Sequence, residues 1–101
     1  MTIEERIYAG NRAKEVLENE VFAQAMADMK QEIIDQWQQS PARDSEAREK
    51  LWTMLKLAEK LESHLRTTFD SGKMAKLDLD HKQTMREKLR SVFPSSVPML
   101  D

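Results

Sequence analysis

One stretch of this chain, from Asp44 to Gly72, has the pattern of a single long helix with one apolar face. Asp44 or Ser45 supplies a capping oxygen at its start, and Gly72 supplies a residue that tolerates a positive φ at its end. A helix of about seven turns with one apolar stripe needs a partner to cover that stripe. The stripe consists of residues at steps of three and four: Leu51, Met54, Leu55, Ala58, Leu61, Leu65 and Phe69.

A second amphipathic helix is predicted just before it, from about Glu20 to Gln38. Ser40-Pro41 ends this helix, because proline lacks the amide donor and disfavours helical backbone at the residue before it. The connection to Asp44 is short, and short loops join antiparallel neighbours, so we expect a helical hairpin with Trp37 and Trp52 packed near its turn. The apolar face of the second helix steps by four, three, four and four through Phe22, Met26, Met29, Ile33 and Trp37.

The first residues predict an N-terminal helix. Thr2 and Glu5 form a capping box, so this helix begins at Ile3. Its stripe is weak and is interrupted by Gly10, which costs about 1 kcal/mol relative to Ala in a helix. Gly10 therefore marks a bend, a close helix contact or a frayed first turn. Asn19 either ends this helix or caps the next, and no Pro or Gly prevents the two from running on as one.

The residues after Gly72 are ambiguous, because apolar and acidic residues alternate over 73–80 as in an extended segment. Asp80 and Gln83 form another capping box, which predicts a short last helix from His81 to about Phe93. We therefore predict an all-α fold, a long antiparallel helical hairpin with an N-terminal helix and a short C-terminal helix. We expect one domain over 1–93 and a flexible tail over 94–101.

Composition excludes several classes of protein. A chain of 101 residues forms one small domain with incomplete burial, which favours self-association. It has no cysteine, hence no disulfide or thiolate chemistry. We expect neither a signal peptide nor a membrane span, since no run of about 18 apolar residues exists.

The net charge of −2 conceals a gradient along the chain. Residues 1–40 hold four basic against eight acidic residues, 41–72 hold six of each, and 73–93 hold six basic against three acidic. The acidic N-terminal part of one subunit and the basic C-terminal part of another would attract each other, which favours head-to-tail association. Ordinary solvated helix faces would explain the same charges.

No motif of catalysis appears. Two glycines cannot build phosphate-binding loops, and we predict no enzyme, no catalytic residue and no cofactor. His64, beside the apolar stripe, is expected to be a partly buried structural residue. Asp78, Asp80 and His81 form a small cluster that would suit a divalent ion, but helix capping explains it better, so no metal is predicted.

Two sets of residues are predicted to bind partners. The partner or oligomer interface is assigned to apolar residues of the hairpin: Phe22, Met26, Met29, Ile33, Trp37, Trp52, Leu61 and Leu65. Contacts to nucleic acid or to an acidic partner are assigned to five cations that could follow phosphates: Lys73, Lys76, Lys82, Arg86 and Arg90. This basic part lacks aromatic residues that would stack on bases.

Several spaced fragments form an ordered pattern over residues 12–77: R-A-K-E-V-L-E-N-E-V-F at Arg12–Phe22, then Trp37, S-P-A-R-D at Ser40–Asp44, R-E-K-L-W at Arg48–Trp52, H-L at His64–Leu65 and G-K-M-A at Gly72–Ala75. The pattern resembles small all-helical proteins of tailed bacteriophages and prophages, of the virion-morphogenesis and DNA-packaging kind. No catalytic residue carries over, and the residues from Asp78 on lie outside the pattern.

The resemblance implies a non-enzymatic phage accessory protein that acts by helix-mediated protein–protein interaction in virion assembly or DNA packaging. Its expected partners are itself, as a homo-oligomer, and a phage structural or packaging protein or a host protein. Its expected location is the cytoplasm of the bacterial host, or the virion. One alternative is a DNA-binding small packaging subunit. Another is an inhibitor whose acidic first forty residues bind a host protein.

Overall fold

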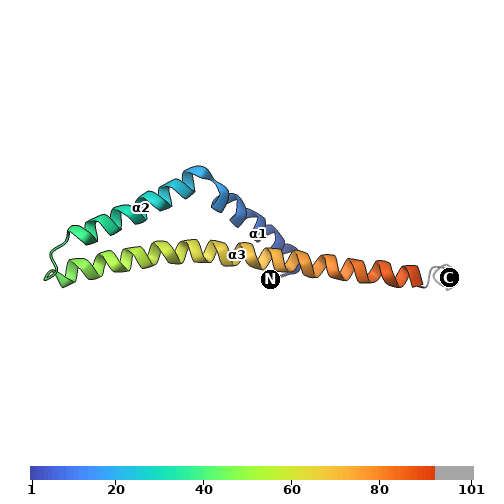
Figure 1. Cartoon of the computed structure of the whole chain (residues 1–101). Coiled ribbons are helices and arrows are strands. Elements are labelled where there is room, and N and C mark those ends of the chain that lie inside the picture. The colour runs from blue at the N-terminus through green and yellow to red at the C-terminus, as the bar shows by residue number, and fades with distance from the viewer. Residues whose placement is uncertain (93–101) are drawn as a thin grey trace.

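The computed structural model is an elongated molecule in which two shorter helices lie along one very long helix (Figure 1). It describes residues 1–92 and has principal-axis extents of 82 × 25 × 18 Å. The helices are α1 (Ile3–Glu18), α2 (Glu20–Gln39) and α3 (Ser45–Val92), and residues 1–92 contain no strand. The all-α fold class is therefore confirmed. The tail predicted over 94–101 lies outside the described residues.

The predicted starts of the helices are confirmed by their caps. The amide of Glu5 donates to the Thr2 hydroxyl at 3.1 Å, and that hydroxyl donates to the Glu5 carboxylate at 3.1 Å. Asn19 has both of its expected roles, because its own amide bonds to the last turn of α1 while its side chain accepts from Phe22 at 2.9 Å. The side chain of Asp44 accepts from the amide of Ala47 at 3.2 Å and so caps α3.

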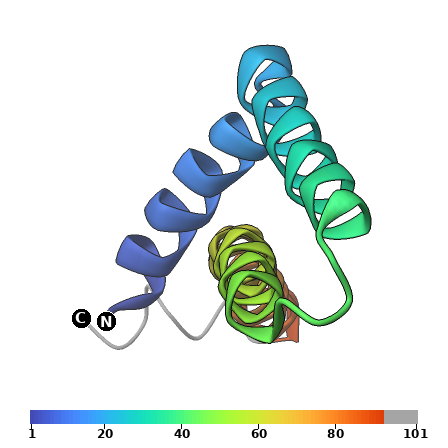
Figure 2. The ribbon, with the colours of Figure 1, turned by 90° about the vertical axis from the view of Figure 1, so that its left-hand side faces the viewer.

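The long helix runs back along α2 and then along α1. Its first turns lie beside the end of α2, where Arg48 stacks on Trp37. Further along, Lys30 of α2 forms an ion pair with Glu62 at 2.7 Å. Further still, Gly10 of α1 touches Gly72. Viewed end on, α1 and α2 lie over two different sides of α3 (Figure 2).

Helix α3 does not end at Gly72 but continues to Val92, as one helix of 48 residues. The predicted end at Gly72 and the separate helix from His81 are therefore wrong, and residues 73–80, which the sequence left ambiguous, are helical. Gly72 is a helix-interior residue whose role is close contact, and residues 1–92 contain no positive φ. Asp80 likewise lies inside the helix, where its carbonyl accepts from the Thr84 hydroxyl at 2.9 Å.

The crossing of α1 and α3 is made by small residues. A Cβ built on either Gly10 or Gly72 would lie 2.7 Å from the Cα of the other, so the two backbones are in direct contact. Ala13 and Ala75 are buried beside them. Arg6 ties the crossing together by donating to the hydroxyl and the carbonyl of Ser71, at 3.0 and 3.1 Å. Of the three interpretations of Gly10, the close helix contact is correct.

The hydrophobic core is thin. Within residues 1–92 five hydrophobic residues are buried, and three of them are alanines: Ala13, Met26, Ile33, Ala58 and Ala75. No large side chain among the described residues is fully buried. In the same part of the chain, fifteen large apolar side chains are exposed, so most of the apolar surface is left uncovered.

Candidate interaction surfaces

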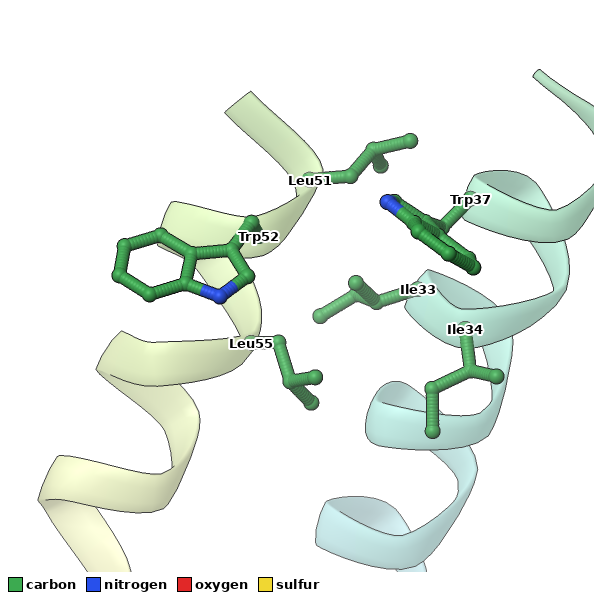
Figure 3. Close-up of a pocket in the computed structure, with 6 residues that line it drawn as sticks. All are labelled: Ile33, Ile34, Trp37, Leu51, Trp52 and Leu55. Carbon is green, nitrogen blue, oxygen red and sulfur yellow. The ribbon is translucent and has the colours of Figure 1, made fainter. Parts of the chain in front are cut away.

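An apolar groove of about 280 Å³ lies between α2 and α3, close to the turn that joins them (Figure 3). Its walls contain three residues from each helix: Ile33, Ile34, Trp37, Leu51, Trp52 and Leu55. Ile33 and Leu55 point into the space between the helices, whereas the indole of Trp52 lies on the side of α3 away from α2 (Figure 3). The steps of four from Ile33 to Trp37 and from Leu51 to Leu55 place each pair on one helix face.

Arg48 fixes one wall of the groove. Its guanidinium lies 4.0 Å from the centre of the Trp37 ring. It also donates to the carbonyls of Trp37 and Ser40, at 3.1 and 3.2 Å, and to the Ser40 hydroxyl at 3.0 Å. A ring held in this way loses little freedom when a partner covers it.

The two tryptophans remain accessible. Trp37 is 42% exposed and Trp52 is 56% exposed, although both line the same groove. Neither indole N–H donates a hydrogen bond within residues 1–92, so both stay available to a partner. The expected packing near the turn is therefore incomplete, because the groove between α2 and α3 is open.

The structure divides the eight predicted interface residues into three groups. Met26 and Ile33 are buried inside the chain, between α2 and α3. Phe22 and Leu65 are half-buried. The exposed members are Met29, Trp37, Trp52 and Leu61.

Sequence reasoning missed Ile34, Leu51 and Leu55 as members of a site. Their signal was their spacing, because Ile34 lies three residues from Trp37, Leu55 lies three residues from Trp52, and Leu51 lies four residues from Leu55. Three more apolar residues of α3 are exposed but lie outside the groove: Met54, Leu57 and Leu61.

The last turns of α3 project beyond the N-terminal end of α1 (Figure 1). Every residue from Asp80 to Val92 is exposed, and we call residues 80–92 the free end. Three of the predicted cations, Lys82, Arg86 and Arg90, follow one another at steps of four and so form one row.

The other two cations lie apart from this row, beside the crossing with α1. Lys73 and Lys76 border a hollow that α1 shares. Lys73 lies about 180° round the helix from Lys82, pairs with Asp70 at 3.4 Å and covers the ring of Phe69. The five cations therefore do not form a single track.

The residues considered for metal or acid–base chemistry do not converge. His64 is exposed, so the expectation of a partly buried histidine is wrong. Asp78 and Asp80 are two positions apart on one helix and point in different directions, and Asp78 pairs with Lys82 at 3.4 Å. The described residues hold no group of three or more potential metal ligands.

Among the described residues, the pKa of Arg12 is clearly shifted. The hydroxyl of Tyr8, which accepts from Arg12 at 3.2 Å, and the carboxylate of Glu15 raise the pKa of the Arg12 guanidinium. This shift maintains a charge that arginine already has at neutral pH, so it creates no acid or base.

Comparisons with protein-family models, with curated proteins and with solved structures find no match to this chain. None of the helices over residues 1–92 is both long enough and apolar enough to cross a membrane.

Proposed function

We propose that this protein is a non-enzymatic accessory that acts by helix-mediated binding of other protein chains, including copies of itself. The observation that supports this proposal is the contrast, in the described part of the chain, between five buried hydrophobic residues and fifteen exposed large apolar side chains. A small chain that buries so little of its apolar surface is marginally stable alone. A partner that binds only the folded form stabilises it by mass action.

The groove near the turn is the surface best suited to such binding. Tryptophans dominate the binding energy of many interfaces, and grooves between helices accept the apolar face of a partner helix. Covering the exposed half of one indole removes on the order of 100 Å² from water, which contributes about 2 kcal/mol. Trp37 and Trp52 together could therefore supply much of the affinity for a partner.

Virion assembly or DNA packaging is the setting that we propose for this activity, on the basis of the sequence resemblance alone. In that setting the partner is a phage structural or packaging protein. A host protein is the alternative partner, and the acidic residues 1–40 favour one with a basic surface.

The first test is the mass of the purified protein in solution, measured by light scattering over a range of protein concentrations. We expect a defined oligomer at about 0.1 M NaCl that persists at about 1 M, because salt screens charges and leaves apolar burial intact. Trp52→Glu should raise its dissociation constant by about thirtyfold, the equivalent of about 2 kcal/mol.

The matched control is Leu57→Glu. Leu57 is 62% exposed, close to the 56% of Trp52, and lies five residues further along α3, about 140° round the helix. We expect this variant to associate like the wild type. Equal weakening by both variants would refute the groove as the contact, and a monomeric wild type at every concentration would refute self-association.

A second candidate function is that of a DNA-binding small packaging subunit. It is favoured by the row of Lys82, Arg86 and Arg90 on a helix end that no other described helix covers. Such a subunit would bind duplex DNA with an affinity that falls steeply as salt rises. Binding that is absent or insensitive to salt would eliminate this candidate.

A further inference from the structure

The free end of α3 and the outer face of α2 have opposite charges. We propose that they bind each other between two copies of the chain, so that the copies associate head to tail. This inference rests on the proposed function, since it names a second copy as the partner. It adds a contact apart from the groove, between residues 80–92 of one copy and the outer face of α2 of another, which we define by Val21, Asp28 and Asp35.

The free end has the composition of a helix that needs a partner. Met85, Leu89 and Val92 are 46, 56 and 66% exposed, and their steps of four and three place them on one face. Beside that face runs the row of Lys82, Arg86 and Arg90. The thirteen residues span about 20 Å, and an isolated helix of this length is marginal in water.

The outer face of α2 offers complementary charge. Helix α2 contains four acidic residues and one cation, Lys30, whose charge is already paired with Glu62 of α3 at 2.7 Å. Within residues 1–92 no other ion pair involves α2. Asp28 and Asp35 are seven residues apart and so lie on one face, where each accepts only from a glutamine amide of the same helix.

That same face also has an apolar contact point. Val21 precedes Asp28 by seven residues and is 78% exposed. It lies in a shallow hollow of α2 together with Ala25 and Asp28. An approaching helix with an apolar face and a row of cations thus meets an apolar patch followed by carboxylates.

The two surfaces cannot meet within one chain. The free end points away from α2 along a continuous helix (Figure 1). At the rise of an α-helix, Val92 lies about 45 Å beyond Glu62, the residue that pairs with Lys30. The contact must therefore be made by a second copy.

The charges also decide the direction of association. Residues 80–92 hold four cations and two carboxylates, whereas α2 holds four carboxylates and one cation. Two free ends would repel each other, as would two α2 faces, so unlike surfaces are paired. When two copies bind in this way, one free end and one α2 face remain unbound. Further copies can bind to them, and the result is a closed ring or an open chain of copies.

A charge-reversal experiment on the full chain tests this arrangement. One variant carries R86E and R90E, a second carries D28R and D35R, and a third carries all four substitutions. All four positions are exposed, and circular dichroism at 222 nm verifies that helicity is retained. Sedimentation velocity at about 0.1 M NaCl measures the association of each variant.

We expect each two-substitution variant to associate at least about tenfold more weakly than the wild type. The four-substitution chain, and an equimolar mixture of the two weaker variants, should recover association because opposite charges face each other again. The control K60E/R66E reverses the same number of exposed cations on α3 outside the free end and should leave association unchanged.

The outcomes separate this inference from the proposed function. Wild-type association in both two-substitution variants would overturn the head-to-tail contact and leave the groove proposal standing. Weak association that neither the four-substitution chain nor the mixture restores would also overturn it. A wild type that stays monomeric would overturn the head-to-tail contact together with self-association.

Discussion

The close crossing of α1 and α3 makes Gly72→Ala the most informative single substitution. A Cβ at this position would lie 2.7 Å from the Cα of Gly10, 2.9 Å from the carbonyl oxygen of Arg6 and 3.4 Å from the Gly10 amide nitrogen. All three are backbone atoms, so no side chain can rotate out of the way. The helices must separate instead, and the optimal distance between carbon atoms of about 3.5–4.0 Å requires a movement of roughly 1 Å.

Two opposing effects set the magnitude. Replacing glycine by alanine inside a helix contributes about 1 kcal/mol of stability through helix propensity. Forcing a methyl group into a close-packed contact costs about 1–3 kcal/mol. The separation also strains the hydrogen bonds from Arg6 to Ser71 and loosens the crossing at which Ala13 and Ala75 are buried. We therefore expect a net loss of about 1–2 kcal/mol, despite the higher propensity of alanine.

Thermal unfolding followed by circular dichroism, at one fixed protein concentration, measures this effect. A loss of 1–2 kcal/mol corresponds to a drop in Tm of roughly 5–15 °C for a domain of this size. The matched control is Asn11→Ala, which raises helix propensity at an exposed position next to Gly10 and should stabilise the protein slightly. An equal or higher Tm for Gly72→Ala would refute the reasoning, since it would mean that propensity outweighs the contact.

Two further substitutions test the hairpin of α2 and α3. Arg48→Ala should lower the free energy of unfolding by about 2 kcal/mol, because it removes the hydrogen bonds to Trp37 and Ser40 and the stacking on the indole. Urea unfolding measures this loss. An equal loss for Arg43→Ala, in the same turn, would contradict the prediction. Lys30→Met and Glu62→Gln should each lower the free energy of unfolding by less than about 1 kcal/mol, because both side chains are about one-third exposed. A double-mutant cycle that gives a coupling energy above about 2 kcal/mol would rule this out.

The helix starts could be predicted from sequence because caps are local. A capping oxygen and the amide that it accepts from are three residues apart, as at Thr2, Asn19 and Asp44. No distant residue is needed to form such a bond. The end of the helix before Pro41 was predictable for the same reason. The proline ring fixes the backbone angle φ of its own residue and removes its own amide donor, so no distant residue is involved.

The role of Gly72 could not be predicted in the same way. Glycine is common both at helix ends and where two helices touch, and the residues around Gly72 are compatible with either. The deciding neighbour is Gly10, which is distant in sequence. The pair of Asp80 and Gln83 predicts a helix start wrongly for a related reason, because a capping box marks a start only when the residues before it are not already helical.

The apolar faces of the hairpin were predictable, but which of their residues stay exposed was not. Apolar periodicity predicted that both hairpin arms have surfaces to cover, and the structure leaves Trp37 and Trp52 exposed. Burial of Met26 and Ile33 depends on which side of α2 meets α3. Exposure of Trp52 and Leu61 depends on how far α1 and α2 extend over α3.

By itself, then, the sequence determined the all-α composition, the places where helices begin, the gradient of charge and the excess of apolar side chains over what a small core can hold. These depend on composition and on interactions within about four residues. Only the tertiary structure decided that α3 is continuous through Gly72, that its free end has no covering helix among residues 1–92, and that the groove beside Trp37 stays open. Burial is a relation between residues far apart in the chain, and it is settled only when the helices pack.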